Sequence, residues 1–344
     1  MNVLFFLSAG EDGVAYHRLY LPSGYLQNHE VRRRTKDLFP ADLEWADVVV
    51  VSRVMDGDPD KIRAICDSYN VKIVIDVDDL WILPQNHILH GYYQKTQYGK
   101  KQENYLRIAD QVWTTNIRLA DEIKPFNKNV HIIPNALPYG EGQFTDEKIE
   151  SDRVRFFYAG GHTHKRDINL LKDVNRELRK DEVFKEIGQF VLAGGFEQKA
   201  DVYVDKIWAD MEQVYSGHAV KSPTYKRIYG KGVDNYMELY READVGLIPL
   251  EDNRFTRCKS NLKILECAAK KIPAIVSDVE TYKDNNPPVL YSNFIFPFKN
   301  RIKTILLYGH EIERLGQDLH DWAMEHHYLP TVNKLREEAL KNIS

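Results

Sequence analysis

Short apolar runs recur along this chain, and each is followed by a turn and then by a helical pattern. In the first part they cover residues 3–7, 48–51, 72–75, 111–114 and 131–133. In the second part they cover residues 155–158, 190–193, 245–248 and 274–276. Because near-continuous apolar runs are typical of strands covered on both faces, the alternation predicts parallel sheets flanked by helices. The expected fold class is therefore α/β, built from doubly wound Rossmann-like units.

The length of 344 residues favours two domains, since single hydrophobic cores stop growing at roughly 250–300 residues. Turn-forming residues at 137–142 and an acidic stretch up to residue 152 precede a new strand. We predict one Rossmann-like domain over 1–140, a linker over 141–152 and a second Rossmann-like domain over 153–310. Residues 311–344 are expected to form helices, with Trp322, Tyr328 and Leu329 as apolar anchors.

Charge and cysteine content exclude some classes of protein. The 47 Lys and Arg residues against 51 Asp and Glu residues give a net charge of -4, which argues against strong non-specific binding to nucleic acid. Cys66, Cys258 and Cys267 have no metal-ligand spacing, and their odd number fits no complete disulfide framework. A strand rather than a signal peptide is expected at the N-terminus, and no apolar stretch approaches the ~20 residues of a membrane span. We therefore expect a cytoplasmic protein.

The segment most informative about chemistry combines a strand at 243–250, a loop at 251–258 and a helix expected to open near Lys259 and Ser260. Unpaired N–H groups and the positive end of the helix dipole make a helix N-terminus an anion site. A serine beside a lysine at that position suits a diphosphate. Glu266, two turns further on, can accept hydrogen bonds from a ribose diol. The alternative is that Lys259 and Lys263 are solvated and that Ser260 is only an N-cap.

Residues 243–250, 259–269 and 271–278 resemble the donor-binding region of GT-B glycosyltransferases, most closely glycosyltransferase family 4. Residues 157–167 resemble the first strand and glycine turn of that family's C-terminal domain. Residues 109–116 and 130–135 resemble the end of its N-terminal domain, and residues 13–22 the N-terminal loop and helix of some members. The segments follow the family's order over most of the chain.

The resemblance implies a GT-B fold, with two Rossmann-like domains facing each other across a cleft and C-terminal helices that return to the N-terminal domain. It also implies a hexosyl- or pentosyltransferase that moves a sugar, with retention, from a nucleoside-diphosphate sugar such as a UDP-sugar to an acceptor hydroxyl. One departure concerns the transferred sugar. The family often has a Glu eight positions before Glu266, where this chain has Cys258. A buried small residue explains Cys258 better than a nucleophile does.

The resemblance points to further donor contacts. The Gly160–Gly161 turn lets the backbone approach a ligand closely, and His164 and Lys165 can add positive charge beside it. The loop at 229–232 resembles the family's nucleobase loop. The predicted donor-binding residues are Gly160, Gly161, His164, Lys165, Tyr229, Lys259, Ser260, Leu262 and Glu266.

Clustered aspartates follow the strand at 72–75. Asp76 and Asp78 form a DxD motif, which can hold a divalent cation, but that use belongs to another glycosyltransferase fold. The resemblance implies that no metal or other cofactor is required. A DxD after a strand also occurs in aspartyl-phosphate phosphatases, although Leu80 does not match their usual continuation. We favour Asp76, Asp78 and Asp79 as residues that accept hydrogen bonds from the acceptor or from neighbouring loops.

The acceptor side of the site is expected in the first domain, in loops that follow strands. We predict catalytic contributions from Glu11, Asp78 and His87. A histidine near the cleft can guide a proton off the acceptor. The predicted acceptor-binding residues are Gly13, Arg18, Asp76 and Asp79.

The expected activity is glycosyl transfer, with charge on the departing diphosphate stabilised electrostatically. Three alternatives stay open: a nucleotide-sugar epimerase or hydrolase of the same fold, a phosphohydrolase using Asp76 and Asp78, and a non-catalytic nucleotide-sugar-binding module. The expected partners are a nucleotide-sugar donor and an acceptor with a hydroxyl group. A glycan, a lipid-linked sugar, a small molecule, a protein and a modified nucleic acid all fit the second description.

Overall fold

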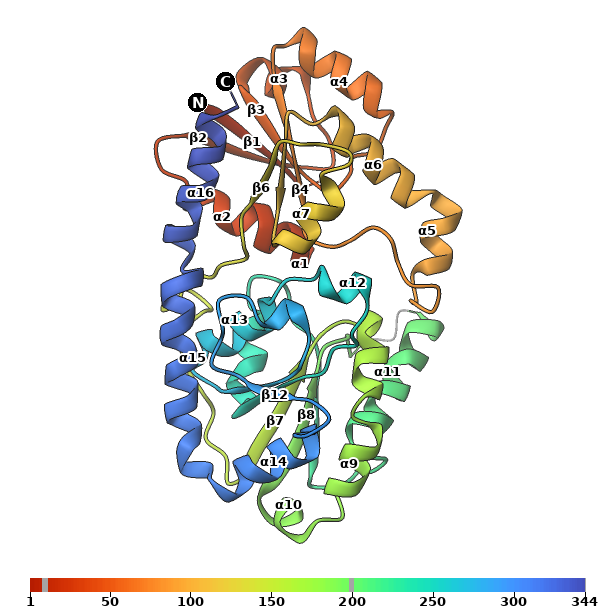
Figure 1. The fold of residues 1–344 in the computed structure, drawn as a ribbon, viewed down its shortest axis with the longest axis vertical. Coiled ribbons are helices and arrows are strands. Elements are labelled where there is room, and N and C mark those ends of the chain that lie inside the picture. The colour runs from red at the N-terminus through yellow and green to blue at the C-terminus, as the bar shows by residue number, and fades with distance from the viewer. Residues whose placement is uncertain (8–11, 198–200, 344) are drawn as a thin grey trace. The chain divides into compact units, whose positions relative to one another are not determined.

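The computed structural model describes residues 1–7, 12–197 and 201–343, and the chain divides into two compact units (Figure 1). Unit 1 comprises Met1–Ala136, Arg257–Ser260 and His327–Ser344. Unit 2 comprises Leu137–Thr256 and Asn261–His326. Each unit is built on one parallel sheet of six strands with flanking helices, so the predicted α/β class is confirmed.

The sheet of unit 1 has the strand order β2-β1-β3-β4-β5-β6, and all neighbouring strands are parallel. The strands are β1 (Asn2–Leu7), β2 (Glu30–Thr35), β3 (Val48–Ser52), β4 (Lys72–Val77), β5 (Gln111–Thr114) and β6 (Val130–Ile132). The order reverses between β1 and β3, which makes the carboxyl ends of these strands the topological switch point of unit 1.

The core of unit 1 forms because β1 and its neighbours are apolar on both faces. On one face Val3, Phe5 and Leu7 pack with Leu19 and Leu329. The covering helices are α1 (Gly13–Ala15), the π-helix η1 (Tyr16–Tyr20), α2 (Leu21–Ser23) and α16 (Leu329–Lys341). The remaining helices of the unit are α3 (Pro40–Trp45), α4 (Pro59–Ser68), α5 (His90–Thr96), α6 (Tyr98–Ile108) and α7 (Ile117–Ile123), of which α4 and α6 contact β4.

The sheet of unit 2 has the order β12-β11-β10-β7-β8-β9 and is also parallel. Its strands are β7 (Val154–Ala159), β8 (Gly188–Ala193), β9 (Tyr225–Ile228), β10 (Val245–Ile248), β11 (Ala274–Ser277) and β12 (Leu290–Ser292). The order reverses between β7 and β10. Ligands of doubly wound sheets bind outside the carboxyl ends of the strands at such a reversal.

The helices of unit 2 cover this sheet and then lead back to unit 1. The α-helices are α8 (Lys165–Asn169), α9 (Lys172–Leu178), α10 (Glu182–Ile187), α11 (Val202–Tyr215), α12 (Arg254–Arg257), α13 (Leu262–Ala269), α14 (Phe298–Leu307) and α15 (Ile312–His327). The 3-10 helices are η2 (His162–His164), η3 (Tyr236–Glu242), η4 (Glu280–Tyr282) and η5 (Gly309–Glu311). Helix α15 lies in unit 2 and α16 in unit 1, which confirms the predicted return of the C-terminal helices. Within the described ranges, no helix combines the length and apolarity that crossing a membrane requires.

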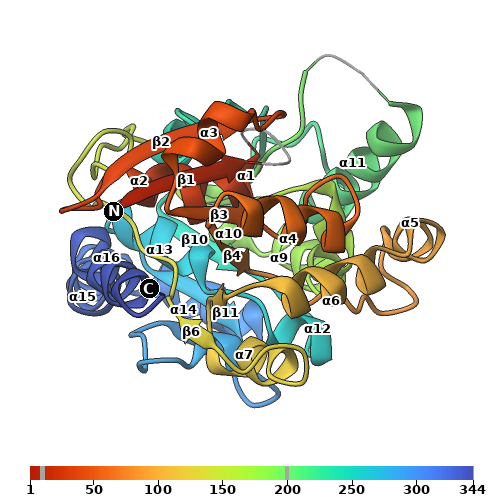
Figure 2. The ribbon, with the colours of Figure 1, turned by 90° about the horizontal axis from the view of Figure 1, so that it is seen from above.

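Three strands, β2, β9 and β12, fall outside the apolar runs used for prediction, and all three are edge strands. Figure 2 shows β2 at the margin of its sheet, beside β1. An edge strand pairs on one side only and is less covered, so it needs fewer apolar residues. In β2, Arg32 lies over the Trp45 ring and Arg33 over the Tyr20 ring, at 4.1 and 4.6 Å. Residues 32–34 are exposed on this edge strand.

Candidate donor and acceptor sites

Glycines join the carboxyl ends of β7, β8 and β9 in unit 2. The Gly160 amide donates to the Ala193 carbonyl at 3.3 Å, and the Gly230 amide donates to the Gly195 carbonyl at 2.5 Å. A Cβ atom on Gly194 would lie 2.3 Å from the Gly160 carbonyl oxygen, and its φ of +126° also requires glycine. The three strand ends therefore meet as closely packed backbone, and Tyr158 and Trp208 pack against the glycines.

Lys263 on α13 reaches this backbone. Its ammonium group donates to the carbonyl oxygen of Ala159 at 2.5 Å and lies 5.2 Å from the centre of the Tyr158 ring. Ala159 ends β7 and precedes the Gly160–Gly161 turn. The sequence analysis names Lys263 only in the alternative in which it is solvated. Its spacing of three from Glu266 places both residues on one helix face.

Glu266 lies one turn after Lys263 and is 6% exposed. The Tyr240 hydroxyl donates to Glu266 Oε2 at 2.5 Å. Burial raises the pKa of Glu266, and the nearby Lys263 ammonium opposes that shift. The predicted ribose contact is thus a buried carboxylate held by a tyrosine.

A side-chain network spans the switch point of unit 2. His164 Nδ1 lies 2.7 Å from one oxygen of Asp167, whose other oxygen accepts from the Glu251 amide at 2.9 Å. Arg166 binds both oxygens of Glu251, at 2.9 and 2.8 Å. Because Glu251 follows β10 and His164 follows β7, the network ties together the loops of the two strands that flank the reversal. Lys165 in turn pairs with Asp210 at 2.6 Å.

The predicted nucleobase loop begins with Tyr229, which is 46% exposed. The Arg227 guanidinium lies 4.7 Å from the Trp208 ring centre and 5.1 Å from that of Tyr229. Arg227 also donates to the carbonyl oxygens of Leu192 and Gly194 at 3.0 and 2.5 Å. Burial lowers the pKa of Arg227. An exposed aromatic ring is thereby held beside the glycine-rich strand ends.

The segment Arg257–Ser260 is bound by side chains of unit 1. The Asn116 amide group donates to the carbonyl oxygens of Cys258 and Lys259 at 3.0 and 3.1 Å. The Asn135 amide group donates to Ser260 Oγ at 2.9 Å. The Lys259 ammonium lies 3.2 Å from a carboxylate oxygen of Asp79. Predicted donor contacts Lys259 and Ser260 are therefore grouped with unit 1, whereas Leu262 and Glu266 belong to unit 2.

The expected helix start near Lys259 and Ser260 is wrong: α13 begins at Leu262, with Asn261 as its N-cap residue. Distant amide side chains hold the preceding residues outside the helix, which the local sequence does not reveal. Cys258 is 3% exposed, in agreement with its interpretation as a buried small residue. All three cysteines are free and buried.

Arg18 and Asp76, both predicted as acceptor contacts, bind each other. Arg18 Nε and Nη2 donate to the two oxygens of Asp76, each at 2.8 Å, and both side chains are 1% exposed. Arg18 Nη1 also donates to Asn135 Oδ1 at 2.9 Å. Burial raises the pKa of Asp76 and Arg18 opposes the shift, while burial beside Arg18 lowers the pKa of Arg336 to about 9. The pair joins η1 to the end of β4.

Arg53, which the sequence interpretation does not name, organises the other two aspartates. It follows β3 with a φ of 59°, and its Nε donates to Asp78 Oδ1 at 2.7 Å. Its Nη2 lies 3.4 Å from Asp79 Oδ2. Arg53 and Asp78 lie close together because β3 and β4 are parallel neighbours whose carboxyl ends lie at the same edge of the sheet. Among the residues described, no group of three or more His, Cys, Asp or Glu side chains could hold a metal ion.

Three further predicted residues are His87, Gly13 and Glu11. His87 Nδ1 accepts from the Leu89 amide at 3.1 Å, within the loop after β4. At Gly13, a Cβ atom would meet nothing within 4 Å, so there is open space beside α1. Glu11 lies outside the described residues.

No protein-family model and no curated protein matches the chain. Solved structures do match. The chain is similar to sucrose-phosphate synthase from Thermosynechococcus elongatus, with a TM-score of 0.70 at 12% identity over 100% of this chain and 99% of that one. It is similar to Anabaena HepE in complex with UDP, with a TM-score of 0.67 at 10% identity over 99% and 100%. The chain is also similar to a UDP-forming trehalose-phosphate synthase from Burkholderia xenovorans, with a TM-score of 0.66 at 12% identity over 99% of both chains. With two six-stranded parallel sheets and full-length similarity to these enzymes, the chain has the GT-B fold of glycosyltransferases.

Proposed function

We propose that this protein is a glycosyltransferase that moves a sugar from a nucleoside-diphosphate sugar to an acceptor hydroxyl. The observation that carries the proposal is the arrangement at the switch point of unit 2. There the glycine-joined ends of β7, β8 and β9 lie beside a lysine that reaches the last peptide of β7. A cation beside a glycine turn that follows a strand suits a diphosphate.

In this proposal the Gly160–Gly161 backbone and the ammonium groups of Lys263 and Lys165 stabilise the departing diphosphate. Preorganised donors and charges aimed at a leaving group are the largest single contribution in many enzymes. Glu266, held by Tyr240, is the proposed ribose contact, and Tyr229 lies at the proposed nucleobase position. The proposed mechanism does not use a metal ion.

The similar structures support a uridine nucleotide. Anabaena HepE has been solved with UDP and with UDP-glucose, and the Burkholderia xenovorans enzyme is named as UDP-forming. We propose a UDP-sugar as the donor on this basis. Retention of the anomeric configuration rests on the sequence resemblance to glycosyltransferase family 4.

The geometry disfavours the phosphohydrolase alternative. A nucleophilic aspartate needs a carboxylate oxygen free to attack phosphorus. Both oxygens of Asp76 are bound by Arg18 in the interior, and Asp78 is paired with Arg53.

A thermal-shift screen with UDP-, GDP-, ADP- and TDP-sugars tests the proposal. A ligand that binds only the folded state stabilises it by about 2.7 kcal/mol at a hundred times its Kd. We expect the UDP-sugars to raise the melting temperature, and mass spectrometry with an acceptor panel to find a glycosylated product. No stabilisation by any of these nucleotide sugars would contradict the proposal. A product mixture containing only free sugar or an epimer would instead favour the hydrolase or epimerase.

A further inference from the structure

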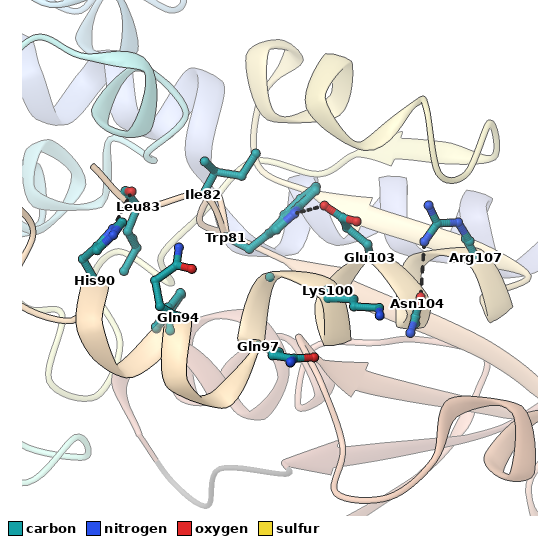
Figure 3. A pocket seen from close by; sticks show the side chains of 12 residues that line it. Trp81, Ile82, Leu83, His90, Gln94, Gln97, Lys100, Glu103, Asn104 and Arg107 are labelled. Atoms are coloured by element: carbon teal, nitrogen blue, oxygen red, sulfur yellow. Dashed lines mark hydrogen bonds between the residues drawn. The ribbon is translucent and has the colours of Figure 1, made fainter. Parts of the chain in front are cut away.

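Unit 1 contains a pocket of about 540 Å³ between residues 81–83 and helices α5 and α6 (Figure 3). No residue assigned above to donor binding, acceptor binding or catalysis lines it. Pockets of roughly 300–1,000 Å³ hold small organic ligands. The volume is therefore large enough for a sugar unit, and the side chains around it indicate which kind.

One wall is a single face of α6. Lys100, Glu103, Asn104 and Arg107 are spaced by three or four residues, so their side chains lie on the same side of the helix. Trp81 forms the facing wall, is 4% exposed, and donates from Nε1 to Glu103 at 3.3 Å. Figure 3 shows this bond joining the two walls. One wall of the pocket is thus aromatic and is hydrogen-bonded to the polar helix face that forms the other wall.

The charged groups of the pocket are unevenly matched. In the described part of the chain, the Lys100 side chain makes no hydrogen bond or ion pair, and the Arg107 side chain donates only to the neutral Asn104, at 3.3 Å. The Arg107 guanidinium also lies 4.9 Å from the Phe126 ring centre. Glu103 already accepts from Trp81. Two cations therefore face the pocket against one carboxylate, which favours an anionic group on the ligand.

Amide side chains supply the neutral part of the lining. Gln94 and Gln97 line the pocket and, in the described ranges, make no side-chain hydrogen bond. Each amide offers both donors and an acceptor, which is the combination that matches hydroxyl groups. Amides beside a tryptophan suit a polyhydroxylated ligand better than an apolar one.

Tyr93 connects the pocket with the aspartates at the end of β4. Its ring lines the pocket and lies 4.4 Å from the Tyr98 ring centre. The charges of Arg53, Asp79 and Asp78 act on the Tyr93 hydroxyl, whose pKa is raised mainly by burial. The pocket therefore lies beside the loop that follows β4, where the acceptor side of the site is expected.

We propose that this pocket binds a sugar unit of the acceptor that carries an acidic group, a carboxylate, sulfate or phosphate, and that is not the unit receiving the transferred sugar. The inference rests on the proposed function, because only a transferase has an acceptor. It makes the acceptor an acidic oligosaccharide, held by Lys100 and Arg107 at its charge and by Gln94 and Gln97 at its hydroxyls.

Binding without any nucleotide sugar tests the proposal. The fluorescently labelled full chain is applied to an array of neutral and acidic oligosaccharides. We expect retention on acidic members and at least a tenfold weaker signal for Lys100→Gln. Lys95→Gln is the matched control, because Lys95 is an exposed lysine on α5 outside the pocket, and it should bind like the wild type.

Four results would overturn the inference: retention of no glycan, equal retention of neutral and acidic glycans, unchanged binding by Lys100→Gln, or equal loss in Lys95→Gln. Inorganic sulfate or phosphate that displaces the glycan as well as the free acidic oligosaccharide does would show a simple anion site and would also overturn it.

The glycan array and the donor screen test the two proposals separately. Glycan binding without any response to nucleotide sugars would remove the transferase and leave the pocket. Donor binding without glycan retention would remove the pocket and leave the transferase. If both succeed, Lys100→Gln should raise KM for the acidic acceptor several-fold while donor affinity stays unchanged.

Discussion

Arg18 holds both carboxylate oxygens of Asp76 at 2.8 Å in the interior of unit 1, where each side chain is 1% exposed. The same guanidinium donates to Asn135, whose amide group donates to Ser260. An ion pair far inside the unit thus orders the residues that precede α13.

Asp76→Asn should destabilise unit 1 by about 3–5 kcal/mol, because removal of one partner leaves a buried charge unmatched, here next to Arg336. Native-state hydrogen exchange of the β4 amides measures the change. The double variant Arg18→Met with Asp76→Leu should recover much of the loss. As a control, Lys124→Ala removes an exposed pair with Asp121 and should change stability by less than about 1 kcal/mol. A mild effect of Asp76→Asn would show that the pair is dispensable.

Asn116→Asp should loosen the segment Arg257–Ser260. The aspartate keeps the oxygen that caps α7 by accepting from the Leu119 amide, but loses the N–H groups that bind the carbonyls of Cys258 and Lys259. Limited trypsin digestion followed by mass spectrometry should show faster cleavage after Arg257 or Lys259. Cleavage at the wild-type rate would mean that the Asn116 bonds do not hold the segment.

Gly194→Ala should destabilise unit 2 by about 1–3 kcal/mol or more, because its Cβ atom would lie 2.3 Å from the Gly160 oxygen and the residue has a positive φ. The midpoint of thermal unfolding measures it. Gly309→Ala provides the matched control, since nothing lies within 4 Å of its Cβ position. Similar midpoints for the two variants would contradict the tight approach of β7 and β8.

Lys263→Met should weaken UDP binding by about 10- to 100-fold, because a charge-assisted hydrogen bond contributes about 1.5–3 kcal/mol. Isothermal titration calorimetry with UDP measures the dissociation constant. Lys206→Met changes an exposed lysine of α11 and should leave the constant unchanged. Wild-type affinity in Lys263→Met would remove this lysine from the proposed donor site.

Acidification below about pH 6.5 should destabilise unit 1 through His17. Burial, with a smaller effect of Arg18, lowers the pKa of His17 from 6.5 to about 3. Between these values the unfolded chain binds a proton that the folded chain does not, so stability falls as the pH falls, by on the order of 1 kcal/mol per pH unit. Melting temperatures between pH 3.5 and 7.5 should decline less steeply for His17→Gln. His310→Gln, at an exposed position, should keep the wild-type slope; a steep decline in His17→Gln would contradict the assignment.

Much of the fold could be predicted because central strands of a parallel sheet are apolar on both faces. The runs at 111–114 and 245–248 coincide with β5 and β10. The edge strands β2, β9 and β12 are not predicted by apolar runs, since a strand with one neighbour does not need such a run. The start of α13 was predicted too early because Asn116 and Asn135, more than a hundred residues away, hold Cys258 to Ser260 outside the helix.

The candidate site divides in the same way. Glycine turns after strands and the DxD motif are local, so the sequence pointed to Gly160 and to the aspartates. The pairing of Lys263 with the end of β7, of Arg53 with Asp78, and the pocket on α6 depend on which strands and helices become neighbours.

By itself, the order of residues determined an α/β chain of two Rossmann-like halves and the positions of its glycine-lined turns. These properties follow from the alternation of apolar runs and the backbone freedom of glycine, both of which act locally. Only the tertiary structure decided which charges meet: Arg18 with Asp76, Lys259 with Asp79, and Lys100 and Arg107 along one wall of a pocket. Electrostatic partners are set by distance in space, and chain folding brings residues together that no local pattern relates.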